Sequence, residues 1–141
     1  MCLLLTACSG PTEDSKKVIN SPRAPKAIGP YSQAIQVGNT LYCSGQIAMN
    51  PETGELVQDS IEAETKQVLD NLGAVLQEAG MDYSDVVSAT VFMSNMEFYK
   101  QINDVYARYF TEKPPARAAV QVANLPKYVN VEIACIAVKS R

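Results

Sequence analysis

The stretch that decides the fold is VNVEIACIAV, from Val129 to Val138, which has the pattern of a buried strand carrying one carboxylate. Alternate residues of a strand point to the same face of a sheet. The first face holds only apolar residues, and the second is mostly apolar: Val129, Val131, Ile133, Cys135 and Ala137, then Asn130, Glu132, Ala134, Ile136 and Val138. Helices can cover one face. The other needs a cover too, so we expect a second copy of the chain and hence a homo-oligomer.

The segments before this strand complete one domain, residues 23–141. A strand over 116–122 precedes it, with a connection at 124–127, and a β-branched run predicts another strand over 86–93. Gly38-Asn39 lies between apolar runs at 33–37 and 40–45, which is typical of a hairpin with a two-residue loop. Residues 51–54 read as a surface turn.

Two helices are expected between the strands. Apolar residues recur at helical spacing over 61–79, with Asp59 or Ser60 as cap and Gly80 as the end. A capping box from Ser94 to Glu97 opens the second helix, which Pro114 and Pro115 should stop. Its expected inward stripe is Tyr99, Ile102, Tyr106 and Tyr109 with Phe110. The order β-β-α-β-α-β-β predicts a two-layer α+β domain with both helices on one face of the sheet.

The composition narrows the chemistry. The 141 residues carry a net charge of −3 with no run of Lys or Arg, which disfavours a general nucleic-acid binder. The chain has no histidine, so the commonest general base and metal ligand are missing. Its cysteines form no CxxC pair, so we expect no metal site. Cys43 and Cys135 lie in strand-like segments and are interpreted as small buried residues rather than as a disulfide.

The front end resembles part of a bacterial lipoprotein leader. Leu5-Thr6-Ala7-Cys8 matches a lipobox, in which the cysteine is lipidated after cleavage before it. The basic region and most of the apolar region of such a leader are missing, as a misplaced start or a trimmed leader would explain. Residues 1–22 are therefore read as a leader remnant followed by a polar tether. This predicts a membrane tether through Cys8 and a location in the cell envelope. The alternative is a cytoplasmic protein with an irregular N-terminus.

Two charges stand out in the last strands. Arg117 is surrounded by alanines, which leave room beside a guanidinium able to bind a carboxylate through two hydrogen bonds. Glu132 lies on a face that should be covered, where loss of water would raise its pKa toward that of a general acid or base. The alternatives are a surface ion pair for Arg117 and a salt-bridged carboxylate at a strand edge for Glu132.

Five short motifs carry a resemblance that spans about residues 18–141: GPYSQA at 29–34, SGQI at 44–47, PAR at 115–117, LP at 125–126 and VEI at 131–133. In this order they resemble the RidA family, also called YjgF or endoribonuclease L-PSP. The resemblance implies a chorismate-mutase-like α+β fold, a homotrimer with clefts between subunits, and no cofactor. It also implies hydrolysis of 2-imino acids, such as 2-iminopropanoate and 2-iminobutanoate, to 2-keto acids and ammonia.

The resemblance assigns roles by position. Arg117 would hold the substrate carboxylate, and Glu132 would orient or activate the water. Further substrate contacts fall on Tyr31, Ser44, Gly45 and Asn103. This sequence departs from the family's usual pattern at two places near Arg117. Ala119 stands where many members have a cysteine, and residues 111–115 form a shorter segment than usual, which bears on substrate preference.

Two other functions are kept as alternatives. The chain could be a binding module that holds small carboxylates without turnover, as a sensor, chaperone or translation inhibitor. Ribonuclease activity, suggested by the family's older name, ranks third because the chain is acidic and lacks histidine and a basic stripe.

Overall fold

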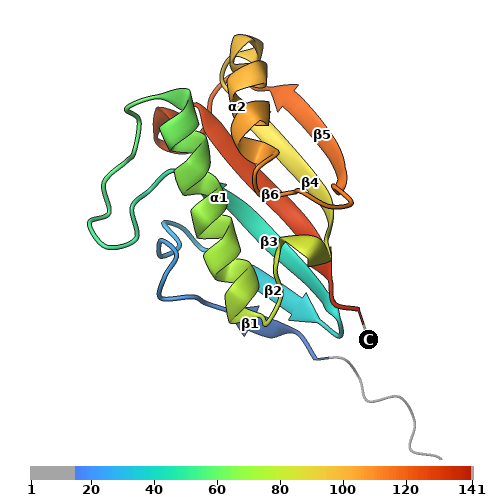
Figure 1. Cartoon of the computed structure of the whole chain (residues 1–141). Coiled ribbons are helices and arrows are strands. Elements are labelled where there is room, and N and C mark those ends of the chain that lie inside the picture. Colours follow the sequence, from blue (N-terminus) through green and yellow to red (C-terminus); the bar gives the residue numbers. More distant parts are fainter. Residues whose placement is uncertain (1–14, 141) are drawn as a thin grey trace, which may run out of the picture.

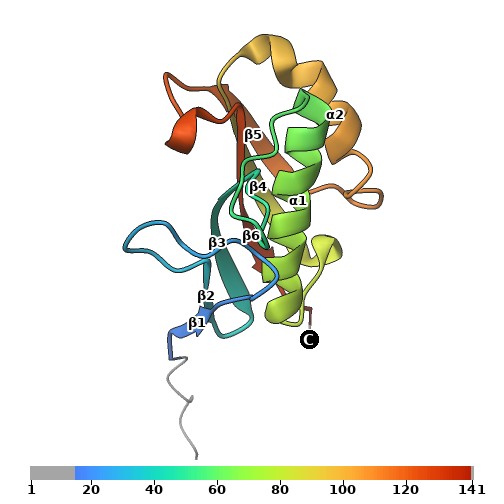
Figure 2. The same ribbon diagram turned by 90° about the vertical axis from the view of Figure 1, so that its left-hand side faces the viewer.

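The computed structural model describes residues 15–140, which form one six-stranded sheet with two helices packed on one face (Figures 1 and 2). The strand order is β1-β2-β3-β6-β4-β5. The elements are β1 (Lys17–Ile19), β2 (Ala34–Val37), β3 (Thr40–Ile47), α1 (Ile61–Glu78), β4 (Val86–Met93), α2 (Tyr99–Tyr106), β5 (Ala116–Gln121) and β6 (Val131–Val138), with short 3₁₀ turns η1 (Tyr83–Asp85), η2 (Met96–Phe98) and η3 (Pro126–Tyr128). The predicted two-layer α+β class is confirmed.

β1 was not predicted. It pairs antiparallel with β2, from Lys17 opposite Gln36 to Ile19 opposite Ala34. The sheet therefore begins inside the segment that the sequence analysis assigned to the tether. The buried amide of Gln33 holds the following turn, because it accepts from the Ser21 N–H at 2.6 Å and donates to the Pro25 carbonyl at 2.8 Å. The lipobox, with Cys8, lies outside the described residues.

The hairpin between β2 and β3 forms as predicted. Val37 pairs with Thr40 across the two-residue loop, and Gly38 has a φ of 57°, a conformation that glycine adopts without strain. β3 then pairs with β6, which pairs with β4. The one parallel pair is β4 with β5, and α2 makes the crossover between them (Figure 1).

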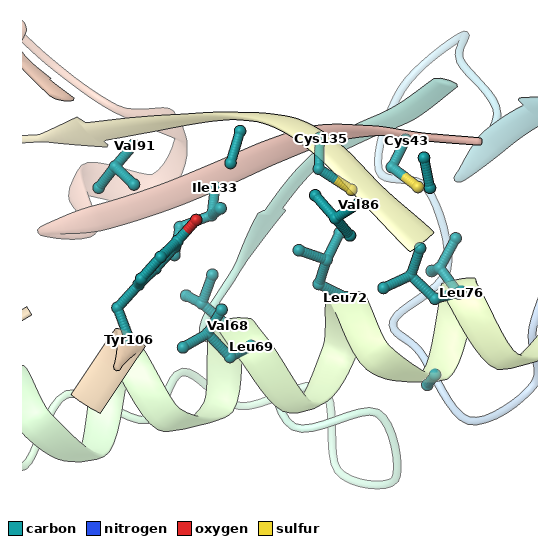
Figure 3. Packing of buried hydrophobic residues seen from close by; sticks show 14 of the residues in the cluster. Cys43, Val68, Leu69, Leu72, Leu76, Val86, Val91, Tyr106, Ile133 and Cys135 are labelled. Carbon is teal, nitrogen blue, oxygen red and sulfur yellow. The ribbon is translucent and has the colours of Figure 1, made fainter. Parts of the chain in front are cut away.

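α1 supplies most of the helical side of the core. Ser60 caps it by accepting a hydrogen bond from the Ala63 N–H, and Gly80, with a φ of 69°, follows its end. The buried stripe packs against β3 and β6, as Figure 3 shows for Val68, Leu72 and Leu76 beside Ile133 and Cys135. Among the described residues, no helix is long and apolar enough to cross a membrane.

The second helix differs from the prediction at both ends. Asn95, rather than Ser94, caps the segment by accepting from the Glu97 N–H. Ser94 is occupied elsewhere, because its hydroxyl donates to the Asn130 side chain at 2.9 Å. α2 ends at Tyr106, well before Pro114. Of the predicted stripe, Ile102, Tyr106 and Phe110 are buried, Tyr109 is partly buried and Tyr99 is exposed.

Within the described part of a single chain, only one face of β6 is covered. Its four residues on the helix side are Val131, Ile133, Cys135 and Ala137, all buried. Cys135 lies opposite Cys43, and both are free buried thiols (Figure 3). On the other side, Ile136, Tyr42 and Val120 remain 37%, 50% and 39% exposed. The open face of the sheet is therefore apolar and has no cover within the described part of one chain.

Candidate functional site

The strand register places Arg117 and Glu132 on opposite faces of the sheet. Ala89 of β4 pairs with both Arg117 and Cys135, whereas Phe92 pairs with Glu132. Residues paired across neighbouring strands share a face, and residues an odd number apart along a strand do not. Cys135 and Ala89 are buried beneath the helices. Arg117 is therefore on the helix side, and Glu132 is on the open side.

Arg117 has aromatic rather than acidic neighbours. Its guanidinium carbon lies 4.7 Å from the centroid of the Tyr106 ring and 5.8 Å from that of Tyr99. One guanidinium nitrogen, Nη2, donates to the Tyr99 hydroxyl at 3.3 Å. Over residues 15–140 the salt bridges are Lys66–Asp70 and Lys100–Asp104, so Arg117 has no carboxylate partner there. Its charge is available to an anion from outside this part of the chain.

A cavity of about 350 Å³ lies beside Arg117, lined by Asn103, Tyr106, Ala107, Phe110, Pro114, Pro115 and Arg117. The structure thus brings together two of the predicted site residues, Asn103 and Arg117. The Tyr106 hydroxyl is buried without a hydrogen-bond partner, and this burial, opposed by the charge of Arg117, raises the pKa of Tyr106 to about 12. Asn103 contacts Tyr99 from the next turn of α2, and the hydrogen bond from its amide is the main cause that lowers the pKa of the Tyr99 phenol.

Glu132 lies in a second cavity, of about 310 Å³. It is lined by Ile28, Tyr31, Ser44, Gly45, Ile47, Pro126 and Glu132. The other four predicted site residues, Tyr31, Ser44, Gly45 and Glu132, are therefore neighbours. Glu132 is half-buried, and this loss of water raises the pKa of its carboxyl group. It forms no salt bridge with any residue of 15–140.

A β-bulge shapes the second cavity. Cys43 pairs with Cys135 and Gln46 pairs with Ile133, so Ser44 and Gly45 together face the single residue Ala134. Gly45 has no side chain where the Glu132 carboxylate passes, and a Cβ atom at this position would overlap that carboxylate. Ser44 is fixed by its hydroxyl, which donates to the Ser32 carbonyl at 2.6 Å.

The loop that carries Ile28 and Tyr31 forms part of the wall of the second cavity. The Tyr31 hydroxyl accepts a hydrogen bond from the Ile28 N–H at 3.3 Å, so the phenol folds back on its own loop. The main-chain N–H of Ser44 donates to the Gln33 carbonyl at 2.9 Å, which joins this loop to the bulge. Tyr31 therefore lines the same cavity wall as Gly45 and Ile47, although part of its side chain is exposed to solvent.

Sequence reasoning missed two residues that support these cavities. Glu64 of α1 is fully buried and accepts hydrogen bonds from the Asn130 N–H at 2.5 Å, the Asn130 amide at 2.9 Å and the Val131 N–H at 3.1 Å. It thereby holds the start of β6, next to Glu132. Its position on the apolar stripe of α1, three residues after Ile61 and four before Val68, was a signal that could have found it. Tyr99, the second missed residue, was read as part of the core.

The described residues contain no group of three or more His, Cys, Asp or Glu side chains placed to hold a metal ion. The described residues instead form two separate clusters beside these cavities, which we call half-sites. One offers a cation and an amide (Arg117 and Asn103), and the other offers a carboxylate with a phenol and a glycine-lined bulge.

The chain is similar to known proteins over most of its length. The family model described as Endoribonuclease L-PSP matches residues 21–139. A RutC family protein of Pyrococcus abyssi is 49% identical over 125 residues, which cover 89% of this chain and 98% of the relative. A protein of Bos taurus named 2-iminobutanoate/2-iminopropanoate deaminase is 49% identical over 124 residues, covering 88% and 90%. The crystal structure of E. coli TdcF with bound serine superimposes with a TM-score of 0.85 at 39% identity, covering 88% of this chain and 99% of that one.

Proposed function

The chain belongs to the endoribonuclease L-PSP family, also known as RidA or YjgF, and from this premise we propose that it hydrolyses 2-imino acids to 2-keto acids and ammonia. The observation that carries the proposal is the pair of half-sites. Arg117 has no carboxylate partner within residues 15–140 and faces a cavity, and Glu132 is a half-buried carboxylate with a raised pKa in another. Hydrolysis of a 2-imino acid can use both groups, one to bind the substrate carboxylate and the other to accept a proton from the attacking water.

We propose that the complete active site forms between two copies of the chain. Arg117 and Glu132 lie on opposite faces of one sheet, so they can meet only when the Arg117 cavity of one protomer faces the Glu132 cavity of its partner. Such a contact joins two different surfaces, and contacts of this kind close into rings. A homotrimer is the ring that we expect. The exposed side chains Tyr42, Val120 and Ile136 provide the apolar surface for it.

The proposed reaction uses two side chains, Arg117 and Glu132, and one water. Arg117 binds the substrate carboxylate through two parallel hydrogen bonds. The water oxygen attacks the imine carbon, and the Glu132 carboxylate accepts a proton from that water. Glu132 passes this proton to the imine nitrogen, which gives the carbinolamine. Transfer of the hydroxyl proton to the amino nitrogen, again through Glu132, breaks the C–N bond and releases ammonia as the carbonyl forms. Positioning together with one acid/base group accelerates such a reaction by about 10²- to 10⁴-fold or more.

A second function is supported by one specific observation. The Arg117 cavity exists within a single chain and does not need Glu132, so it could hold a small carboxylate without turnover. In that case the protein would be a binding module for keto acids or related anions. Calorimetric binding of 2-oxobutanoate without any acceleration of imine hydrolysis would select this function.

The test is a competition assay. An amino-acid oxidase or a dehydratase generates 2-iminopropanoate or 2-iminobutanoate in the presence of semicarbazide, and keto-acid formation is followed for wild type, Arg117→Ala and Glu132→Gln. Two matched controls change exposed residues outside both cavities, Arg108→Ala and Glu78→Gln. We expect acceleration by wild type and by both controls, and loss in both site variants. Full activity of Arg117→Ala on a small imino acid would refute the assignment.

Lipidation of Cys8 and placement in the cell envelope stay a proposal. Mass spectrometry of the native protein tests it directly, because a mature N-terminus other than a diacylated or triacylated Cys8 would remove it.

A further inference from the structure

Tyr99 is the first residue of α2 and is 41% exposed, although its spacing predicted a core position. Its place is set by β5, the strand that carries Arg117. The side-chain oxygen of Gln121, in β5, accepts a hydrogen bond from the Met96 N–H at 2.8 Å. The Asn95 cap then turns the chain into η2 and α2. These two contacts bring the Tyr99 phenol over the Arg117 guanidinium rather than into the core.

The guanidinium lies between two phenol rings. Tyr106 presents its ring face at 4.7 Å from the guanidinium carbon, and Tyr99 presents its hydroxyl, which accepts from Nη2 at 3.3 Å. We propose that Tyr99 is a positioning residue that holds the Arg117 guanidinium against Tyr106, with its remaining N–H donors directed to the neighbouring cavity for a carboxylate ligand. This inference rests on the proposed role of Arg117 as the carboxylate anchor.

Arg117 needs such a partner for a physical reason. β5 lies at the edge of the sheet, and a long arginine side chain loses considerable rotamer entropy when it is fixed. An acidic partner would fix it but would also compete with an anionic ligand. A neutral phenol fixes it through one of its five N–H donors, and the other four remain for the ligand. Tyr99 therefore pre-organises the guanidinium without neutralising it.

The same geometry predicts a loss of binding in alkali. The groups that face Tyr99 are Asn103 from α2 and Arg117 from β5. The contact with Asn103 is the largest single cause that holds the pKa of the Tyr99 phenol below its ordinary value, and the charge and hydrogen bond of Arg117 act in the same direction. Tyr106, on the other side of the guanidinium, has a pKa raised to about 12. Lys100, the next residue along, is paired with Asp104 at 2.6 Å. As pH rises, Tyr99 ionises before Tyr106, and its phenolate competes with a bound carboxylate for Arg117.

The experiment measures the dissociation constant of 2-oxobutanoate by calorimetry from about pH 7 to pH 10, a range that brackets the ordinary ionisation of tyrosine. Tyr99→Phe keeps the ring and removes the hydroxyl. The matched control is Tyr109→Phe, which removes a phenol oxygen that is also hydrogen-bonded, at 2.7 Å to Asp70, beyond the other end of α2. In parallel, kcat and KM are measured for an imine generated in situ.

We expect Tyr99→Phe to weaken keto-acid binding by about threefold to tenfold, the effect of losing one hydrogen bond to a charged group at a partly exposed position. KM should rise by the same factor with kcat unchanged, and the alkaline loss of affinity should disappear. Tyr109→Phe should resemble wild type. In an Arg117→Ala background, Tyr99→Phe should change nothing further, because Tyr99 acts through Arg117.

Unchanged affinity in Tyr99→Phe, or an alkaline loss that persists in it, would overturn the inference. So would a wild type that binds no 2-oxobutanoate, since no anion would then occupy the Arg117 cavity. Absence of imine hydrolysis with keto-acid binding intact would instead reject the proposed deaminase activity and leave the role of Tyr99 supported by the binding data.

Discussion

Arg117→Ala and Glu132→Gln should each be inactive alone and should recover activity when the two proteins are mixed. The strand register gives the reason. From Arg117 to Glu132 the path crosses two strand spacings, together about 10 Å, and runs three residues along β4, about another 10 Å. The two side chains also point away from each other. No small imino acid can touch both groups of one chain.

The expected recovery follows from random assembly. In an equal mixture, each site draws its arginine from one protomer and its glutamate from the partner. The chance that the first chain carries Arg117 is one half, and the chance that the second carries Glu132 is one half. About a quarter of the sites should therefore be intact, whatever the size of the ring. We expect close to a quarter of the wild-type rate per chain.

The assay is the semicarbazide competition measured before and after the variants are dissociated together and reassembled. Native mass spectrometry of differently labelled chains reports whether mixed oligomers have formed. A mixture of Arg117→Ala with the double variant Arg117→Ala/Glu132→Gln is the control, because it contains no intact arginine and should stay inactive. Mixed oligomers as inactive as their parents would refute a site divided between chains.

Three further predictions follow from the Glu132 cavity and its support. Gly45→Ala puts a Cβ where the Glu132 carboxylate lies, so imine hydrolysis should fall by about tenfold or more, and the free energy of unfolding in urea should fall by about 1–3 kcal/mol, as is typical of overpacking. Burial raises the pKa of Glu132, so kcat/KM of the wild type should fall with decreasing pH at values above the ordinary glutamate pKa of about 4.3; a fall confined to values below that pKa would assign the acid limb to another group. Glu64→Ala leaves three donors without their acceptor and should lower the free energy of unfolding in urea by about 3 kcal/mol, with Glu64→Gln costing less because one acceptor oxygen remains.

Local sequence patterns correctly predicted the secondary-structure elements that are determined by residues close together in the sequence. The hairpin needed only Gly38-Asn39 between two apolar runs, and α1 needed only an apolar stripe with Ser60 and Gly80 at its ends. β1 escaped prediction because three residues in a polar segment carry no periodic signal, and the pairing with β2 is what stabilises them. Asn95 and Ser94 are both good caps. Contacts to the far strands decided between them, since Ser94 bonds to Asn130 and Gln121 accepts from the Met96 N–H.

The residues of the candidate site could be named from the sequence, but their arrangement in space could not. Residue type and motif pointed to Arg117 and Glu132, and the two cavities contain all six predicted positions between them. The sequence did not reveal that Arg117 and Glu132 lie on opposite faces of the sheet, because this depends on the register of β5 against β4. A shift by one residue would have put Arg117 on the face of Glu132. Register is a property of the assembled sheet, and the alanines around Arg117 leave either choice open.

Because of the bulge at Ser44 and Gly45, the fold depends on the number of residues in β3 as well as on their types. Cys43 and Gln46 both point toward the helices although they are three apart, so the extra residue resets the in-and-out alternation of β3. A substitution there alters one contact, whereas deletion of one residue would turn every later side chain of the strand to the wrong side. Insertions and deletions should therefore be excluded from this segment during divergence, even at positions other than Gly45 where the amino acid changes, and gaps between relatives should collect in the surface turn at 51–54 instead.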